Sequence, residues 1–281
     1  MMTAAAFEEI FSALHPHFGQ GEARSLCCIL FEDVLDWHTG RRDRELTAEE
    51  EQQLQQIQDR LLAGEPLQYI LGQADFYNIK LAVSPAVLIP RPETEELVEW
   101  VLEECAMFPT TPRILDIGTG SGCIPVAVKH AWPDSEIWAI DVSEPALLIA
   151  RQNANRYEAT IYFQQVDILD ATQRELLPQF DMIVSNPPYI PHQESDLMSA
   201  DVLLHEPALA LFVPDEDPLV FYRHIMAFAQ THLLPNGQLF FECNEFNAAE
   251  VAELGNQLGF QKGELRNDLQ RKPRMWRGRK G

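Results

Sequence analysis

The 281-residue sequence has no long hydrophobic run and little positive charge. Its purest apolar stretch, residues 208–213, is far too short to span a bilayer, and the first residues show no basic segment followed by an apolar one. We therefore expect a cytoplasmic protein that does not enter membranes. Acidic residues outnumber basic ones by 43 to 21, giving a formal net charge of −22. Such a surface repels a polyanion, so stable nucleic-acid binding is not expected.

Cysteine is also sparse, with five residues and no C-x-x-C pair. An odd, scattered set of cysteines predicts neither a disulfide framework nor a zinc site. The histidines lack partners at metal-ligand spacing, so no metal is predicted. The adjacent Cys27 and Cys28 lie among apolar neighbours, and we expect both to be buried in a helix.

The first 72 residues show apolar side chains at helical spacing. One stripe runs from Phe7 to Leu14 and a second from Leu26 to Val34. A third helix is marked more strongly, because Thr47 and Glu50 have the spacing of a capping box and Gly64 can end the helix in a left-handed conformation. The pattern predicts a small helical domain over residues 1–72.

Residues 73–91 alternate in polarity around residues that favour turns, which predicts a β-hairpin linker. Asn78 stands at the turn, where asparagine is tolerated with little penalty. A helix is predicted from Pro92, since proline suits the first helical position and the following glutamates favour the positive helix end.

From residue 113 onward, apolar strands alternate with helical stretches, which is typical of a parallel sheet covered by helices on both faces. The predicted strands are residues 113–117, 137–140, 161–166, 180–185 and 238–242. Residues 191–217 show no clear periodicity, and we expect either a functional loop or a mobile surface excursion there.

A glycine-rich turn follows the first of these strands. Gly118, Gly120 and Gly122 sit where a strand turns into a helix, so a ligand can approach the backbone closely. Asp141 ends the next strand, where a carboxylate can accept hydrogen bonds from two ribose hydroxyls. Cys123 occupies the place where a dinucleotide fingerprint has its last glycine, which favours S-adenosylmethionine over a nicotinamide dinucleotide. A glycine turn used only for packing is the plainer alternative.

The turn Asn186-Pro187-Pro188-Tyr189 follows the predicted strand 180–185, at the carboxyl end of the sheet. The prolines stiffen this turn, so the Asn186 side chain and the Pro187 carbonyl can be fixed as acceptors, and Tyr189 adds a flat face for stacking. An amide or exocyclic amino group has two N–H donors and a poorly nucleophilic nitrogen. Two fixed acceptors can bind both hydrogens and direct that nitrogen at a sulfonium methyl group. The alternative is a rigid turn without chemistry.

These motifs resemble those of class I methyltransferases with an N-P-P-Y turn, and among them the release factor glutamine methyltransferases, also called the HemK family. The resemblance covers nearly the whole chain and is carried, in the family's order, by residues 64–72 (GEPLQYILG), 87–95 (VLIPRPETE), 115–122 (LDIGTGSG) and 184–190 (VSNPPYI). The string IPRPETE is the most specific, because other N-P-P-Y enzymes do not usually carry it.

The resemblance implies an α/β fold in which a Rossmann-like doubly wound sheet, mostly parallel with an antiparallel last strand, forms a methyltransferase domain over residues 92–281. It implies that the helical residues 1–72 help to dock the protein substrate. It also implies which residues contact S-adenosylmethionine. Asp141 is expected to contact the ribose, Asp167 and Ile168 the adenine, and Asn186 also belongs to the implied cofactor site. The methionine part is expected to contact the residues of the glycine turn, which are Gly118, Thr119, Gly120, Ser121 and Gly122.

The resemblance also implies the methyl acceptor, which is the glutamine carboxamide in the G-G-Q motif of peptide chain release factors. The residues implied to receive it are Asn186, Pro187, Pro188 and Tyr189, of which Asn186, Pro187 and Tyr189 are expected to be catalytic. One position departs from the pattern, because Ile168 stands where some relatives have an aromatic residue and can give only apolar contact. Asp167 could instead cap the segment that follows it.

Two other functions fit parts of the sequence. A nucleic-acid methyltransferase acting on adenine N6 or cytosine N4 would present the same chemistry to the N-P-P-Y turn, but the net charge and the lack of a basic recognition region disfavour it. A non-catalytic, cofactor-binding partner of a translation factor is disfavoured because the cofactor and amide motifs are both intact.

Overall fold

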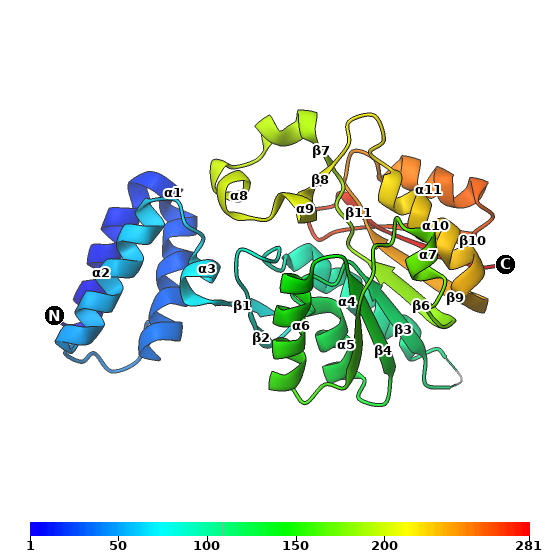
Figure 1. The fold of residues 1–281 in the computed structure, drawn as a ribbon. Coiled ribbons are helices and arrows are strands. Elements are labelled where there is room, and N and C mark those ends of the chain that lie inside the picture. Colours follow the sequence, from blue (N-terminus) through cyan, green and yellow to red (C-terminus); the bar gives the residue numbers. More distant parts are fainter. Residues whose placement is uncertain (109) are drawn as a thin grey trace. The chain divides into compact units, whose positions relative to one another are not determined.

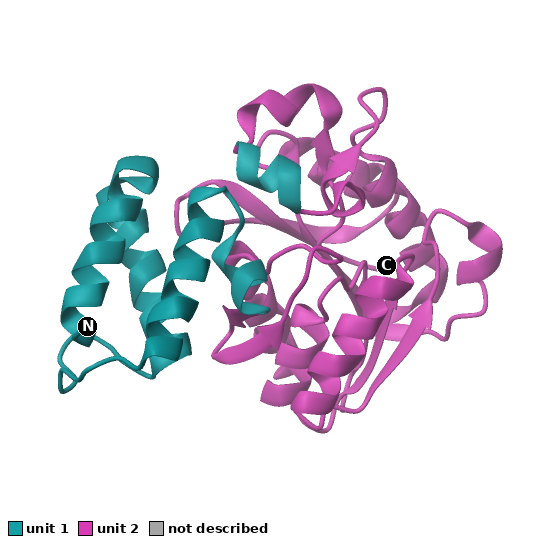
Figure 2. Cartoon of the chain, turned by 60° about the vertical axis from the view of Figure 1, so that its left-hand side comes forward, with its two compact units in different colours: residues 1–72, 200–205 teal, residues 73–199, 206–281 magenta. Residues whose placement is uncertain are grey.

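The computed structural model describes residues 1–108 and 110–281, which form two compact units. Unit 1 contains residues 1–72 and 200–205, and unit 2 contains residues 73–199 and 206–281 (Figure 2). Across these described ranges, no helix combines the length and the apolar character needed to cross a membrane.

Unit 1 is helical, as the apolar spacing predicts. Its helices are α1 (Thr3–Leu35), α2 (Ala48–Leu62), α3 (Leu67–Leu71) and α8 (Ala200–His205). Helix α1 covers both of the first two predicted helices, which meet at a kink where Gly19 has φ 75° and ψ 170°. Phe7, Phe31 and Trp37 pack together in its core, with ring centroids 5.2 to 5.9 Å apart. Cys27 is buried but Cys28 is exposed, so the prediction for Cys28 is wrong; successive residues of a helix face directions about 100° apart.

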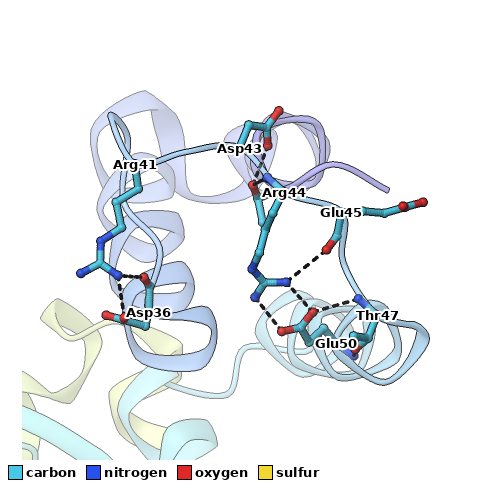
Figure 3. Close-up of polar contacts among 8 residues, drawn as sticks. Asp36, Arg41, Asp43, Arg44, Glu45, Thr47 and Glu50 are labelled. Atoms are coloured by element: carbon cyan, nitrogen blue, oxygen red, sulfur yellow. Dashed lines mark hydrogen bonds and ion pairs between the residues drawn. The ribbon is translucent and has the colours of Figure 1, made fainter.

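The start of α2 confirms the predicted capping box (Figure 3). The backbone N–H of Glu50 donates to Thr47 Oγ1 at 3.2 Å, and the N–H of Thr47 donates to Glu50 Oε2 at 2.9 Å. Arg44 adds two hydrogen bonds to the same carboxylate, at 2.7 and 2.8 Å, and this guanidinium lowers the pKa of Glu50 to about 2. Gly64, just past the helix, has the expected left-handed φ of 89°.

Unit 2 is built on a seven-stranded sheet with the order β10-β11-β9-β6-β3-β4-β5 (Figure 1). Strands β3, β4, β5, β6 and β9 are parallel, whereas β11 is antiparallel to both β9 and β10. This confirms the predicted mostly parallel sheet with an antiparallel last strand. The strands are β3 (Arg113–Ile117), β4 (Glu136–Asp141), β5 (Ile161–Gln165), β6 (Phe180–Ser185), β9 (Leu233–Glu242), β10 (Gln261–Asn267) and β11 (Pro273–Arg279).

Helices cover both faces of this sheet, because alternate strand residues point to opposite sides. Ile114 and Met182 belong to the core on the side of helices α4 (Pro92–Cys105), α5 (Cys123–Ala131) and α6 (Glu144–Arg156). Their strand neighbours Leu115 and Ile183 belong to the core under helices α10 (Val220–His232) and α11 (Ala248–Gln257). A further short helix, α7 (Ala171–Arg174), follows β5. Both faces are buried, which explains the nearly continuous apolar runs of the central strands.

The predicted hairpin is present as β1 (Gln73–Phe76) and β2 (Ile79–Ala82), and it belongs to unit 2. Tyr77 and Asn78 form its turn with φ values of 45° and 62°. The buried Asn153 of α6 holds the end of β2, because its side chain accepts from the Ala82 N–H at 2.6 Å and donates to the Ala82 carbonyl at 2.9 Å. The hairpin therefore rests on the helix that flanks the glycine turn.

Residues 191–217, which lack clear periodicity in the sequence, contain several short helices and strands. The sequence did not predict these elements. They are β7 (Ile190–Pro191), the 3-10 helix η1 (His192–Leu197), α8, α9 (Ala208–Leu211) and β8 (Phe212–Val213). Strands β7 and β8 pair in parallel, with Ile190 opposite Phe212. Contacts distant in sequence stabilise these elements, and hydrophobic periodicity does not reveal such contacts.

Candidate active site

The carboxyl ends of the parallel strands converge on one cavity in unit 2. From β3 the chain proceeds to β4 and β5 on one side, while β6 lies on the other, and such a switch in strand order opens a crevice. Within the described chain, the predicted site residues that line this cavity are Gly118, Thr119, Gly120, Ser121, Asp141, Asp167, Ile168, Asn186, Pro187 and Pro188, whereas Gly122 and Tyr189 are not among its lining residues.

Two glycines of the turn after β3 leave open space for a ligand. Gly118 and Gly120 have φ values of 74° and 53°, and a Cβ added at either position would meet no atom within 4 Å. Gly122 differs, since an added Cβ would lie 3.0 Å from the Cβ of Ala150 in α6. The first two glycines therefore expose backbone to the cavity, and the third allows α5 to pack closely against α6.

Asp141, the last residue of β4, is held in a fixed orientation. Its Oδ2 accepts from the Gly120 N–H at 2.8 Å and its Oδ1 from the Ser143 N–H at 2.9 Å. Burial raises the pKa of this carboxyl, and the backbone N–H donors oppose that rise. Each carboxylate oxygen can accept more than one hydrogen bond, so the oriented side chain can still receive ligand hydroxyls.

Asp116 directly precedes the lining residues Ile117 and Gly118, and the motif LDIGTGSG contains it without indicating a role for it. It is 1% exposed, and within the described residues neither of its carboxylate oxygens makes a hydrogen bond of good geometry. Burial raises its pKa to about 7, the nearby Thr119 hydroxyl opposes the rise, and the charge of Asp141 adds to it. A buried acceptor without a partner beside this turn suits a ligand that carries positive charge, as S-adenosylmethionine does.

Asp167 and Ile168 follow β5 and lie on the cavity wall. The Oδ1 atom of Asp167 accepts from the Leu169 N–H at 2.8 Å, so this side chain does cap the segment that follows it. Ile168 is 7% exposed and contributes apolar surface. The wall at this position can hold a planar apolar group and has a carboxylate at its edge.

A chain of hydrogen bonds, buried at Thr94 and Glu242, links the N-P-P-Y turn to α4 and β9. Asn186 Nδ2 donates to Thr94 Oγ1 at 3.2 Å, and the Thr94 hydroxyl donates to Glu242 Oε2 at 2.6 Å. The Tyr189 hydroxyl donates to the other oxygen of Glu242 at 3.2 Å. The Tyr189 ring packs against the core beneath α10 and α11, and burial raises its pKa.

Sequence reasoning did not identify Thr94, Glu242, Arg91 or Glu206 as parts of the site. Arg91 and Thr94 do line the cavity, and both lie in the string IPRPETE, whose sequence is specific to the family but does not by itself indicate a chemical role. Glu242 ends the predicted strand 238–242, and its carboxylate position is the one signal that could have drawn attention to it.

The sheet order, the glycine turn and the polar strand ends define a class I methyltransferase. Residues 94–214 match the family model "Methyltransferase small domain", and residues 6–72 match "PrmC N-terminal domain". A solved methyltransferase from Pyrococcus furiosus superposes with a TM-score of 0.53 at 17% identity, covering 80% of this chain and 98% of its own, and shows the same fold.

Curated relatives identify the family within that class. The release factor glutamine methyltransferase of Bacteroides thetaiotaomicron is 46% identical over 221 residues, which are 78% of each chain. That of Thermodesulfovibrio yellowstonii is 37% identical over 255 residues, covering 90% of this chain and 89% of the relative. The chain belongs to the release factor glutamine methyltransferase family. It is a methyltransferase, and its cofactor is S-adenosylmethionine.

Proposed function

We propose that this chain transfers a methyl group from S-adenosylmethionine to the side-chain nitrogen, N5, of the glutamine in the G-G-Q motif of peptide chain release factors. The observation that carries this proposal is the Asn186 amide, which lies on the wall of the cavity shared with the glycine turn and donates its N–H to Thr94. The names of the curated relatives support the same acceptor. We further propose a cytoplasmic location, where translation terminates.

In this proposal Gly118, Thr119, Gly120 and Ser121 hold the methionine part of the cofactor. Asp141 accepts the ribose hydroxyls, and Asp167 with Ile168 borders the adenine. Gly122 supports these contacts indirectly by its packing on Ala150. When bound, the cofactor supplies an electrophilic methyl group on its sulfonium sulfur. The rest of the cofactor is the leaving group and departs as a neutral thioether.

The chain's own contribution is orientation. Asn186 Oδ1 and the Pro187 carbonyl accept the two N–H groups of the glutamine amide, which places its nitrogen toward the methyl group, while Pro188 shapes the wall beside it. Orientation of this kind can supply on the order of 7 kcal/mol of barrier reduction. The nitrogen loses a proton to solvent after the new N–C bond forms, so no strong base is required. Tyr189 takes part by holding Glu242.

Transfer from labelled cofactor to a purified release factor, compared with DNA and RNA, tests the acceptor. We expect label on the G-G-Q peptide alone, located by mass spectrometry, because a net charge of −22 opposes binding to a polyanion. Label in nucleic acid alone would refute the proposal. Asn186→Ala should lower kcat on the order of 100-fold, as loss of one oriented polar contact does in comparable sites.

A further inference from the structure

The carboxylate of Glu242 accepts hydrogen bonds on both of its oxygens. It is 1% exposed at the end of β9, where Thr94 donates to Oε2 and Tyr189 donates to Oε1. An ionised carboxylate can only accept hydrogen bonds. Both hydroxyl protons are therefore committed to Glu242.

This commitment fixes the role of Thr94 toward Asn186. A threonine hydroxyl has one proton, and that of Thr94 is given to Glu242, so its oxygen can only accept from the next group. The group at that position is the Nδ2 donor of Asn186, 3.2 Å away. The two ends of an amide have nearly the same shape, and hydrogen-bond direction decides which way the group lies. The donor end of Asn186 faces Thr94, which leaves Oδ1 at the other end.

We propose that Glu242 and Thr94 are positioning residues that set the orientation of the Asn186 amide through a hydrogen-bond chain running in one direction. This inference rests on the proposed function, in which Oδ1 of Asn186 accepts an N–H of the substrate amide. With Asn186 reversed, an NH2 group would face the NH2 group of the glutamine, and the acceptor would be lost.

Charged and titratable groups from several elements surround Glu242. Burial raises its pKa; Thr94, Arg274 of β11 and Tyr189 lower it, and Glu93 of α4 raises it further. Its neighbour Cys243 and the Tyr222 hydroxyl, which donates to the Glu242 carbonyl, complete this environment. Arg274 is the cation that opposes this rise, together with the two hydroxyl donors.

Glu242→Gln tests the direction of the chain with almost no change in volume. With Tyr189 donating to the glutamine oxygen, the glutamine NH2 donates to the Thr94 oxygen. This frees the Thr94 proton to point at Asn186 and reverses the Asn186 amide. We expect kcat for release-factor methylation to fall on the order of 100-fold. The cofactor dissociation constant and the melting temperature should change little. A merely structural role would instead lower stability and cofactor binding together.

Thr94→Val provides a second route to the same loss, since it removes the hydroxyl and keeps the shape. Thr94→Ser should recover most of the lost kcat, because it restores the hydroxyl. The double variant Thr94→Val, Glu242→Gln should lose no more than either single variant, since both act through Asn186. Tyr222→Phe is the matched control: its hydroxyl donates to the Glu242 backbone carbonyl at 3.1 Å and not to the Glu242 carboxylate, so kcat should not change.

Folded Glu242→Gln and Thr94→Val variants with wild-type kcat would overturn the inference. A neutron crystal structure tests it independently of any substrate. We expect the amide deuterons of Asn186 to face Thr94 in the wild type and to turn away in Glu242→Gln, and the opposite orientation in the wild type would refute the inference. If the wild type fails to methylate release factors, the proposed function fails, and the neutron result still decides the amide orientation.

Discussion

Arg91 and Glu206 form an ion pair between residues 115 positions apart, with 2.5 Å between the guanidinium Nη2 and the carboxylate Oε1. The Glu206 side chain is 1% exposed and also accepts from the Ile89 N–H at 3.2 Å. Pro207, Leu209 and Ala210, directly after it, line the cavity. The pair therefore fixes one wall of the proposed cofactor site to the segment that carries Arg91.

Arg91→Met should lower the free energy of unfolding by about 3 kcal/mol, because it leaves the buried Glu206 carboxylate without an ionic partner. Cofactor affinity should fall as well, since the α9 wall loses its anchor. Urea unfolding and titration calorimetry measure the two effects. Arg223→Met is the matched control: it breaks an ion pair with Asp217 whose side chains are 47% and 36% exposed, and it should cost less than about 1 kcal/mol. Equal losses in the two variants would contradict this account.

Alanine substitutions at Gly120 and Gly122 should separate binding from packing. Both residues have positive φ, so each variant should lose about 1 kcal/mol from the left-handed backbone. Only Gly122→Ala places a Cβ 3.0 Å from that of Ala150, and it should be clearly the less stable protein. Only Gly120→Ala adds an atom to the open space of the cavity, and it should show the larger loss of cofactor affinity. The reverse ranking in either measurement would argue against the distinction between the two glycines.

Because of Asp116, the free energy of unfolding should decrease as the pH rises toward neutrality. Its pKa is about 7 in the folded state, against 3.8 for the free side chain, because burial opposes its charge; Asp141 and Cys123 are the other titratable groups coupled to it. The folded protein thus keeps a proton that the unfolded chain has lost. This contribution is fully present below about pH 4 and is lost as the pH rises through about 7. Asp116→Asn should flatten the decline in denaturant titrations between these limits, and parallel profiles would refute the prediction.

Asp141→Asn should weaken cofactor binding by about 10- to 100-fold, the usual effect of removing charge-assisted hydrogen bonds. The asparagine also replaces one of the two acceptors that bind the Gly120 and Ser143 N–H groups, which loosens the turn. Isothermal titration with cofactor measures this loss. Asp170→Asn is a suitable control, because Asp170 caps α7 and is not one of the cavity-lining residues of the described chain. Unchanged affinity in Asp141→Asn would remove Asp141 from the proposed ribose contact.

The features predicted correctly from sequence are those that a short stretch of chain specifies. The capping box of Thr47 and Glu50, the turn at Asn78 and the alternation of strands and helices each depend on neighbours within a few residues. The glycine turn and the N-P-P-Y turn could be placed near each other because the carboxyl ends of parallel strands meet at one edge.

The parts that could not be predicted depend on pairs far apart in sequence. Thr94 and Glu242 are 148 positions apart, and no local pattern indicates that their side chains meet. The same holds for Glu206, which anchors a stretch whose lack of periodicity suggested no structure. Cys28 shows a related limit: apolar neighbours in sequence do not say which side of the helix a residue faces.

Helix α8 lies between η1 and α9 in sequence but belongs to unit 1, so this unit is assembled from two separate parts of the chain. A fragment that stops at Gly72 would lack the six residues of that helix. In a chimera that takes only residues 1–72 from a relative, the helices of the relative would have to pack with the α8 of this chain. Gly64 marks how close that fit is, because an added Cβ would lie 2.8 Å from Oδ1 of Asp201. Recombination between relatives should therefore transfer both parts together.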